Sequence, residues 1–184
     1  NAGCEDEVTF DVTINPLIMI DPIADIFDCV STVLPAIAGS GLSANVTYNT
    51  DPLGLGTNFA PGSIITQSIT LYVFDPDADP NCLGNSEDLI ITIHPLPPVP
   101  IISNVTCLGD QGAILVEAPL GSNFEYQLDG AAAQLANFYA NIPNGTHTVV
   151  VTNTLTTCQN SVQFTINCDC ATPAELTLPQ NTGS

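Results

Sequence analysis

The chain has 184 residues, of which 45% are hydrophobic, and this apolar content is enough to build one or two small folded cores. It contains no lysine or arginine against 19 aspartate and glutamate residues, so its formal net charge at pH 7 is -19. Without cationic side chains it cannot neutralise phosphates, which argues against nucleic acid and anionic membranes as partners. No apolar run reaches the roughly 18 residues of a membrane span, so membrane insertion is not expected.

The seven cysteines, none of them in a CxxC pair, indicate an oxidising, extracytoplasmic compartment. Because their number is odd, at least one disulfide partner is missing from the sequence. The first of them, Cys4, precedes the alternating segment Val8–Asn15 (VTFDVTIN), and Asn15-Pro16 follows. We interpret residues 1–16 as the last strand of a preceding repeat, to which Cys4 also belongs.

The alternating pattern of Val8–Asn15 returns twice further along the chain. Asp88–Pro95 (DLIITIHP) and Ser161–Cys168 (SVQFTINC) have the same alternation and end in isoleucine followed by asparagine or histidine. The period is roughly 75 residues, which is typical of tandem domains. We therefore expect one repeat over residues 17–96, a second over 97–168, and the start of a further repeat in 169–184.

The first complete repeat contains a strand in which Ile69, Leu71 and Val73 alternate with polar residues, as in a half-buried antiparallel strand. Its two cysteines, Cys29 and Cys82, are the natural disulfide partners within the repeat. Such a bridge contributes roughly 4 kcal/mol on the chain-entropy model.

An acidic loop follows this strand and is the strongest candidate for a cation site. Asp75, Asp77 and Asp79 lie at alternate positions, a spacing that suits calcium coordination by oxygen. An EF-hand loop would need glycine at Pro80 and glutamate at Ser86, so that motif is excluded. The favoured interpretation is a solvated acidic loop without a cofactor, and calcium is the alternative.

The segment Pro95–Pro100 (PLPPVP) predicts a stiff link between the two repeats, because proline removes backbone donors and enforces extended geometry. Links of this kind suit an elongated array.

The second repeat shows the same kinds of strand signal. Phe124–Leu128 alternates before an Asp129-Gly130 turn, and Asn144-Gly145 is a second hairpin signal before Thr146–Thr152. Ala131–Ala136 has helical composition but is too short to form a stable helix. Cys107 and Cys158 are the natural pair here, while Cys168 and Cys170 are left unassigned.

Several short strands in each repeat, punctuated by 15 prolines and 13 glycines, predict the fold class: all-β, with tandem immunoglobulin-like β-sandwich repeats in an elongated array. No HExxH, GxSxG or glycine-rich phosphate loop is present, so no enzyme is expected.

The second repeat resembles the SprB-type repeat of gliding-motility adhesins and related surface proteins of Bacteroidetes. The resemblance is carried by these segments: Gly112–Val116, Phe124–Gly130 and Ile142–Val151. The first repeat is similar to another repeat of the same proteins, through these segments: Phe27–Cys29, Leu34-Pro35, Gly54–Pro61, Ile69–Val73 and Asn81-Cys82. The resemblance implies type IX secretion, display on the bacterial cell surface, and adhesion with gliding motility. It implies no catalytic residues.

The sequence thus favours a structural or adhesive segment of a large secreted surface protein. Its partners would be extracellular surfaces or polysaccharide, the neighbouring repeats, and the secretion and surface-attachment machinery. The alternative is an extracellular carbohydrate-binding module, with or without calcium. Such a module would need an exposed aromatic platform, for which the chain offers four tyrosines and no tryptophan.

Overall fold

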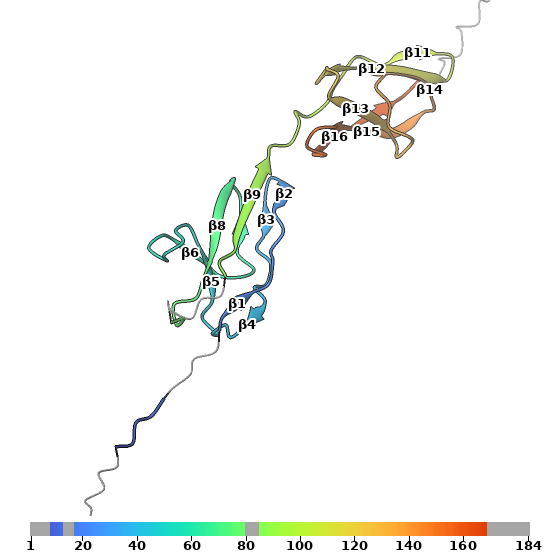
Figure 1. The fold of residues 1–184 in the computed structure, drawn as a ribbon. Coiled ribbons are helices and arrows are strands. Elements are labelled where there is room, and N and C mark those ends of the chain that lie inside the picture. The colour runs from blue at the N-terminus through green and yellow to red at the C-terminus, as the bar shows by residue number, and fades with distance from the viewer. Residues whose placement is uncertain (1–7, 13–16, 80–84, 169–184) are drawn as a thin grey trace, which may run out of the picture. The chain divides into compact units, whose positions relative to one another are not determined.

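The computed structural model describes residues 8–12, 17–79 and 85–168 (Figure 1), and in these residues regular structure consists of strands, without helices. The described residues therefore contain no helix that is long and apolar enough to cross a membrane. The chain divides into two compact units, Asn1–Ile93 (unit 1) and His94–Ser184 (unit 2), next to the proline-rich segment. The all-β prediction is confirmed.

Unit 1 is built from short strands in two layers. They are β1 (Met19–Ile20), β2 (Ile26–Cys29), β3 (Thr32–Val33), β4 (Gly39–Ser40), β5 (Thr47–Asn49), β6 (Asn58–Phe59), β7 (Ile64–Ile65), β8 (Ile69–Phe74) and β9 (Asp88–His94). One sheet has the order β2-β9-β8-β5-β6, and two antiparallel pairs, β1-β4 and β3-β7, make up the rest. The alternating segments Ile69–Val73 and Asp88–His94 are adjacent antiparallel strands, in register from Ile69↔Ile91 to Tyr72↔Asp88.

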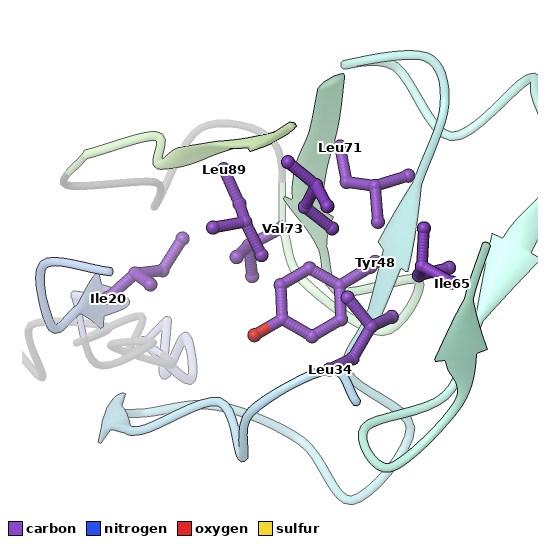
Figure 2. Packing of buried hydrophobic residues seen from close by; sticks show 8 residues of the cluster. Ile20, Leu34, Tyr48, Ile65, Leu71, Val73 and Leu89 are labelled. Atoms are coloured by element: carbon purple, nitrogen blue, oxygen red, sulfur yellow. The ribbon is translucent and has the colours of Figure 1, made fainter. Parts of the chain in front are cut away.

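The core of unit 1 is filled from both layers, as Figure 2 shows with the Tyr48 ring in the middle of the labelled side chains. Its buried members are Ile20, Leu34, Tyr48, Ile65, Leu71, Val73, Leu89 and Ile91. Leu71 and Val73 face inward while Thr70 and Tyr72 do not, which is the period-2 alternation that the sequence predicts. The Tyr48 hydroxyl, inside this apolar cluster, donates a hydrogen bond to the Pro35 carbonyl.

Unit 2 contains seven strands arranged as two facing sheets. They are β10 (Ile101–Ile102), β11 (Thr106–Leu108), β12 (Gln111–Ala118), β13 (Phe124–Leu128), β14 (Phe138–Ile142), β15 (Gly145–Asn153) and β16 (Gln159–Ile166). In one sheet β10 and β11 pair with successive parts of β12, and β14 also pairs with β12. The other sheet has the order β13-β15-β16. This is the strand order of an immunoglobulin-like sandwich.

The core of unit 2 lies between these sheets. Its buried members are Ile114, Val116, Tyr126, Ile142, Val149, Val151, Ile166 and Cys168. Gly112 has a steric reason to be glycine, because a Cβ there would lie 2.6 Å from the Ile166 side chain. Each unit therefore has a separate core, as expected for independent domains.

The two units share one arrangement around a buried tyrosine. Tyr48 of β5 pairs with Val73 of β8, and Tyr126 of β13 pairs with Val151 of β15. Both tyrosines are buried, and each hydroxyl donates to the carbonyl of a proline, Pro35 in unit 1 and Pro119 in unit 2. The two units thus share this strand register and this hydrogen bond.

Two local expectations differ from the structure. Asn144-Gly145 does not close a hairpin, because β14 pairs with β12 whereas β15 pairs with β13 and β16, so the turn connects two sheets. Residues Val8–Val12 form no strand, although their alternation is strand-like. No described strand pairs with them, and a strand requires a neighbour to bond its backbone. Residues 13–15 of the same segment lie outside the described residues.

Candidate functional site

The disulfide of unit 2 joins Cys107 in β11 to Cys168, just after β16. The two Cα atoms are 5.4 Å apart and the bridge closes a stretch of chain with a sequence separation of 61. Cys107 of β11 pairs with Gly112 of β12, and Gly112 lies against the side chain of Ile166, the last residue of β16. The end of β16 is therefore next to β11. The bridge therefore links the first and last parts of the sandwich.

The predicted pairing of Cys107 with Cys158 is wrong, because Cys107 is bonded to Cys168. Cys158 and Cys168 stand before and after β16, whose eight residues span roughly 25 Å in an extended strand. A disulfide tolerates Cα separations of only about 4.4–6.8 Å, so Cys107 at one end of the strand cannot reach a cysteine at the other.

Cys29 and Cys158 each take part in a disulfide as well. The predicted partner of Cys29 is Cys82, which lies outside the described residues, as do Cys4 and Cys170. The pairing of Cys29 with Cys82 therefore stays a prediction.

The acidic loop after β8 is organised around Asp75, which is largely buried. Its Oδ2 accepts a hydrogen bond from the Ser43 backbone N–H (2.7 Å), and its Oδ1 accepts from the Ser43 hydroxyl (2.6 Å) and the Asp77 N–H (3.1 Å). Burial alone would raise the pKa of Asp75, but these hydrogen bonds hold the pKa below its usual value. Asp75 thus ties two loops together as a structural carboxylate.

The predicted calcium ligands are not gathered into one site. Within residues 8–12, 17–79 and 85–168, no group of three histidine, cysteine, aspartate or glutamate side chains could hold a metal ion. Both oxygens of Asp75 face Ser43, while an oxygen of Asp77 accepts a hydrogen bond from the Asn45 side chain. The three carboxylates alternate along the sequence, but those of Asp75 and Asp77 accept hydrogen bonds from protein donors.

We expect Asp75→Asn to destabilise unit 1 by about 1.5–3 kcal/mol, because hydrogen bonds to a buried carboxylate are lost or weakened. The measurement is the free energy of unfolding with and without calcium. Asp77→Asn, which affects a more exposed contact, is the matched control and should cost less. If calcium stabilised the unchanged protein but not the Asp75→Asn variant, the loop would be a calcium site after all.

A second polar pair is found in unit 2, between His147 in β15 and Asp129 in the turn after β13. His147 Nδ1 lies 2.7 Å from Asp129 Oδ2, and His147 Nε2 lies 2.9 Å from the Pro143 carbonyl. Both neighbours are acceptors, and a neutral imidazole has only one N–H, so both hydrogen bonds form only when the ring is protonated. The pKa of His147 is raised, chiefly by the hydrogen bond to Asp129, although burial acts in the opposite direction. The pKa of Asp129 is lowered, also chiefly by this bond.

The His147-Asp129 pair predicts a pH dependence for unit 2. The histidine contributes stability below its unfolded pKa of 6.5, and this contribution is lost as pH rises through the raised folded value. The aspartate contributes above 3.8 and loses its contribution as pH falls through its lowered value. Between about pH 6 and pH 9 Asp129, whose pKa is lowered, stays ionised, so we expect unit 2 to lose stability as His147 deprotonates. Thermal unfolding of His147→Gln should lack this slope, whereas the control His94→Gln should keep it; a stability that rises over this range would contradict the prediction.

The loop between β5 and β6 is held from its base by Asn49, a fully buried residue. Asn49 Oδ1 accepts hydrogen bonds from the N–H groups of Asp51 (2.7 Å) and Gly56 (3.1 Å), and its Nδ2 donates to Asn58. Gly54 lies against the Phe74 ring with φ of +75°, where a side chain would clash. The loop consequently presents Leu53 and Leu55 to solvent on a fixed backbone.

Two hollows on the surface of unit 1 are small. One between β7 and β8 measures about 220 Å³, and one beside Ile18 and Leu42 about 200 Å³. Pockets for small ligands usually enclose about 300–1,000 Å³. The second hollow contains Asp75 and Asn85, whose polar atoms already bond to Ser43 and Ile20 respectively.

No protein-family model matches the chain, and no curated protein matches it. Among solved structures it is similar to the FN1-FN3 domains of chicken CNTN1, with 14% sequence identity and a TM-score of 0.31. That match covers 83% of this chain and 66% of the other. The strand order and the two-sheet cores described above define the protein as a pair of immunoglobulin-like β-sandwich modules.

Proposed function

We propose that the chain is a structural and adhesive repeat segment of a large secreted protein on a bacterial cell surface, without a catalytic role. The observation that carries the proposal is the repetition of one sandwich, with equivalent registers and equivalent buried tyrosines, in two consecutive units. Repetition of a module extends reach and multiplies contacts, which is the requirement of a stalk or adhesin rather than of a single catalytic site.

Covalent and electrostatic features support this role. The bridge between Cys107 and Cys168 joins the two ends of the unit 2 sandwich, and bonds of this type persist outside the cytoplasm. A net charge of -19 without any lysine or arginine keeps neighbouring molecules apart in solution and limits aggregation. The finer assignment, to adhesins of gliding motility exported by the type IX route, depends on the resemblance of unit 2 to SprB-type repeats.

A stalk segment must carry load, so we expect the bridge to limit extension under force. When single molecules are pulled from their two ends, reduction of the disulfides should lengthen the unfolded unit 2 by roughly 200 Å. This length follows from a sequence separation of 61 and about 3.4 Å per extended residue. A Cys107→Ser variant should show the longer extension without reduction. Full extension of the oxidised, unchanged protein would contradict a load-bearing bridge.

Adhesion requires a separate measurement. Beads that carry many copies of the chain should adhere to a polysaccharide-coated surface more strongly than beads with a reduced and alkylated chain, because many weak contacts act together. Tight binding of one soluble glycan to the single chain would instead favour the carbohydrate-binding module. Equal retention of both kinds of bead would contradict the adhesive part of the proposal.

A further inference from the structure

Within residues 8–12, 17–79 and 85–168 no strand pairs with the outer side of β16, which is therefore an open edge of the sheet β13-β15-β16. An open edge offers unpaired N–H and C=O groups to another chain unless it is short, charged, irregular or covered. The other edges of unit 2 have such protection: β10 and β11 are very short, β14 has a register shift and a positive φ at Asn141, and the outer side of β13 is bridged by Gln134. By contrast, β16 has eight residues in uninterrupted register with β15.

The hydrogen bonds show which backbone groups of β16 face outward. The N–H and C=O groups of Thr148 in β15 point away from β16, because both are hydrogen-bonded to Asp129. Gln163 is the partner of Thr148 in the β15-β16 ladder, so its own N–H and C=O groups point away from β15, toward the open edge. By the same alternation Ser161 and Thr165 also face outward. The Ser161 N–H is capped by the Asn160 side chain, and no hydrogen bond to the N–H of Gln163 or Thr165 is formed by the described residues. The preceding segment reaches β16 at its two ends, where the Asn160 side chain donates a hydrogen bond to the Pro97 carbonyl and Cys107 is bonded to Cys168 just beyond the strand.

Unit 1 provides an internal comparison for this edge. Its equivalent strand, β9, is covered by β2, and the outward N–H of Ile90, the counterpart of Gln163, is bonded to Asp25 Oδ1 at 3.0 Å. Under that cover Leu89 and Ile91 are 0% and 1% exposed. Their counterparts in unit 2, Val162 and Phe164, pack on the core but stay half-buried. Among the described residues of unit 2, no strand takes the place that β2 has in unit 1.

Charge also singles out this edge. Between Asp129 and Asp169 the sequence contains no aspartate or glutamate, so β14, β15 and β16 bear no carboxylate. In a chain of net charge -19, copies repel one another over most of the surface, and β16 is the long strand edge where two copies can meet without this penalty.

We propose that β16 pairs with β16 of a second copy, antiparallel across a two-fold axis, to form one sheet that runs through two sandwiches. Centred on Gln163, this arrangement bonds the outward groups of Gln163 to those of its equivalent and places Ser161 opposite Thr165. On the inner face Val162 then lies opposite Phe164 of the other copy, an aromatic to β-branched cross-strand pair that covers both half-buried side chains. The sequence Ser161–Thr165 (SVQFT) is thus complementary to itself under the two-fold operation, as an isologous interface requires.

Sedimentation of the full chain from micromolar to millimolar concentration tests the pairing. We expect a monomer–dimer equilibrium that shifts toward dimer as salt screens the repulsion between copies. Gln163→Asp, which places two carboxylates against one another at the axis, should remain monomeric with unchanged thermal unfolding. Leu155→Asp adds the same charge at an exposed turn and should still dimerise. A monomer throughout, or equal loss in both variants, overturns the proposal.

Disulfide crosslinking tests the register of the proposed β16-β16 pair. In a hydrogen-bonded antiparallel pair the Cα atoms lie about 5.5 Å apart, within the range of a disulfide, so Gln163→Cys should form a covalent dimer on mild oxidation. Ser161→Cys is the matched control, because its equivalent would lie about 13 Å away along the strand and should not crosslink. The exposed segment Val8–Val12 is the other strand-like occupant of the edge. If Val8→Asp with Phe10→Asp abolishes the dimer while Gln163→Cys forms no crosslink, that segment is the partner and the two-fold arrangement is wrong.

Discussion

Combined replacement of Cys107 by serine and Cys168 by alanine is expected to lower the free energy of unfolding of unit 2 by about 4 kcal/mol. The magnitude follows from the entropy of an unfolded chain that loses a closed loop, here with a sequence separation of 61. Small domains have total stabilities of about 5–15 kcal/mol, so this loss is a large share. Calorimetry should show a much lower unfolding temperature for one transition and little change in the other, since the two cores are separate.

Peptide mapping under non-reducing conditions provides the control for this prediction. Pepsin or an aspartate-directed protease is required, because trypsin has no lysine or arginine to cleave. The peptide that contains Cys107 should be recovered joined to Cys168 and not to Cys158. A variant that keeps its stability, or a peptide that joins Cys107 to Cys158, would contradict the connectivity of the structure.

The second large effect is expected at the buried tyrosines. Truncation of Tyr126 to alanine should cost unit 2 about 3–5 kcal/mol, the range for large aromatic side chains in cores, and Tyr48→Ala should do the same to unit 1. Each change removes a fully buried ring, and each leaves a proline carbonyl, Pro119 or Pro35, without its hydroxyl donor. Two calorimetric transitions should therefore move one at a time.

Tyrosine-to-phenylalanine variants separate the two contributions. They keep the ring but lose the hydrogen bond, so a cost of only about 1–3 kcal/mol is expected. Tyr72→Ala, which alters a half-buried side chain on the outward face of β8, is the control and should cost less than either core truncation. If Tyr126→Ala lowered both transitions equally, the two units would not be independent folding domains.

The strand pattern predicted much of this fold, because the alternation of apolar and polar residues along a strand follows which side chains are buried. The strands around Leu71, Leu89 and Tyr126 were identified because one face of each is apolar and the other polar. The Asp129-Gly130 turn was also predicted correctly, since both residues have positive φ values of 48° and 75°. At Asn144-Gly145 the same kind of signal failed, because local turn chemistry does not tell whether the strands on either side belong to one sheet.

Long-range contacts limited the prediction of sites. The order of cysteines along the chain favours Cys158 as the partner of Cys107. The bond is made to Cys168 because the end of β16, and not its start, lies next to β11. The direction of β16 follows from the sheet topology, which the cysteine order does not reveal. His147 and Asp129 were not linked from the sequence, although they lie close together across the β13-β15 ladder. Once strands are paired such a contact can be inferred, since Asp129 directly follows Leu128, whose partner is Val149.

The Asn49-held loop has a consequence for how the protein surface can vary. One buried amide fixes the base of the loop, while the side chains of Leu53 and Leu55 are 73% and 83% exposed. New sequences grafted between Asp51 and Gly56 should therefore be accommodated at little cost to folding, provided that Asn49 and Gly54 are retained. The residues that maintain the fold would then be distinct from those that can vary in sequence, as in the variable loops of other immunoglobulin-like domains.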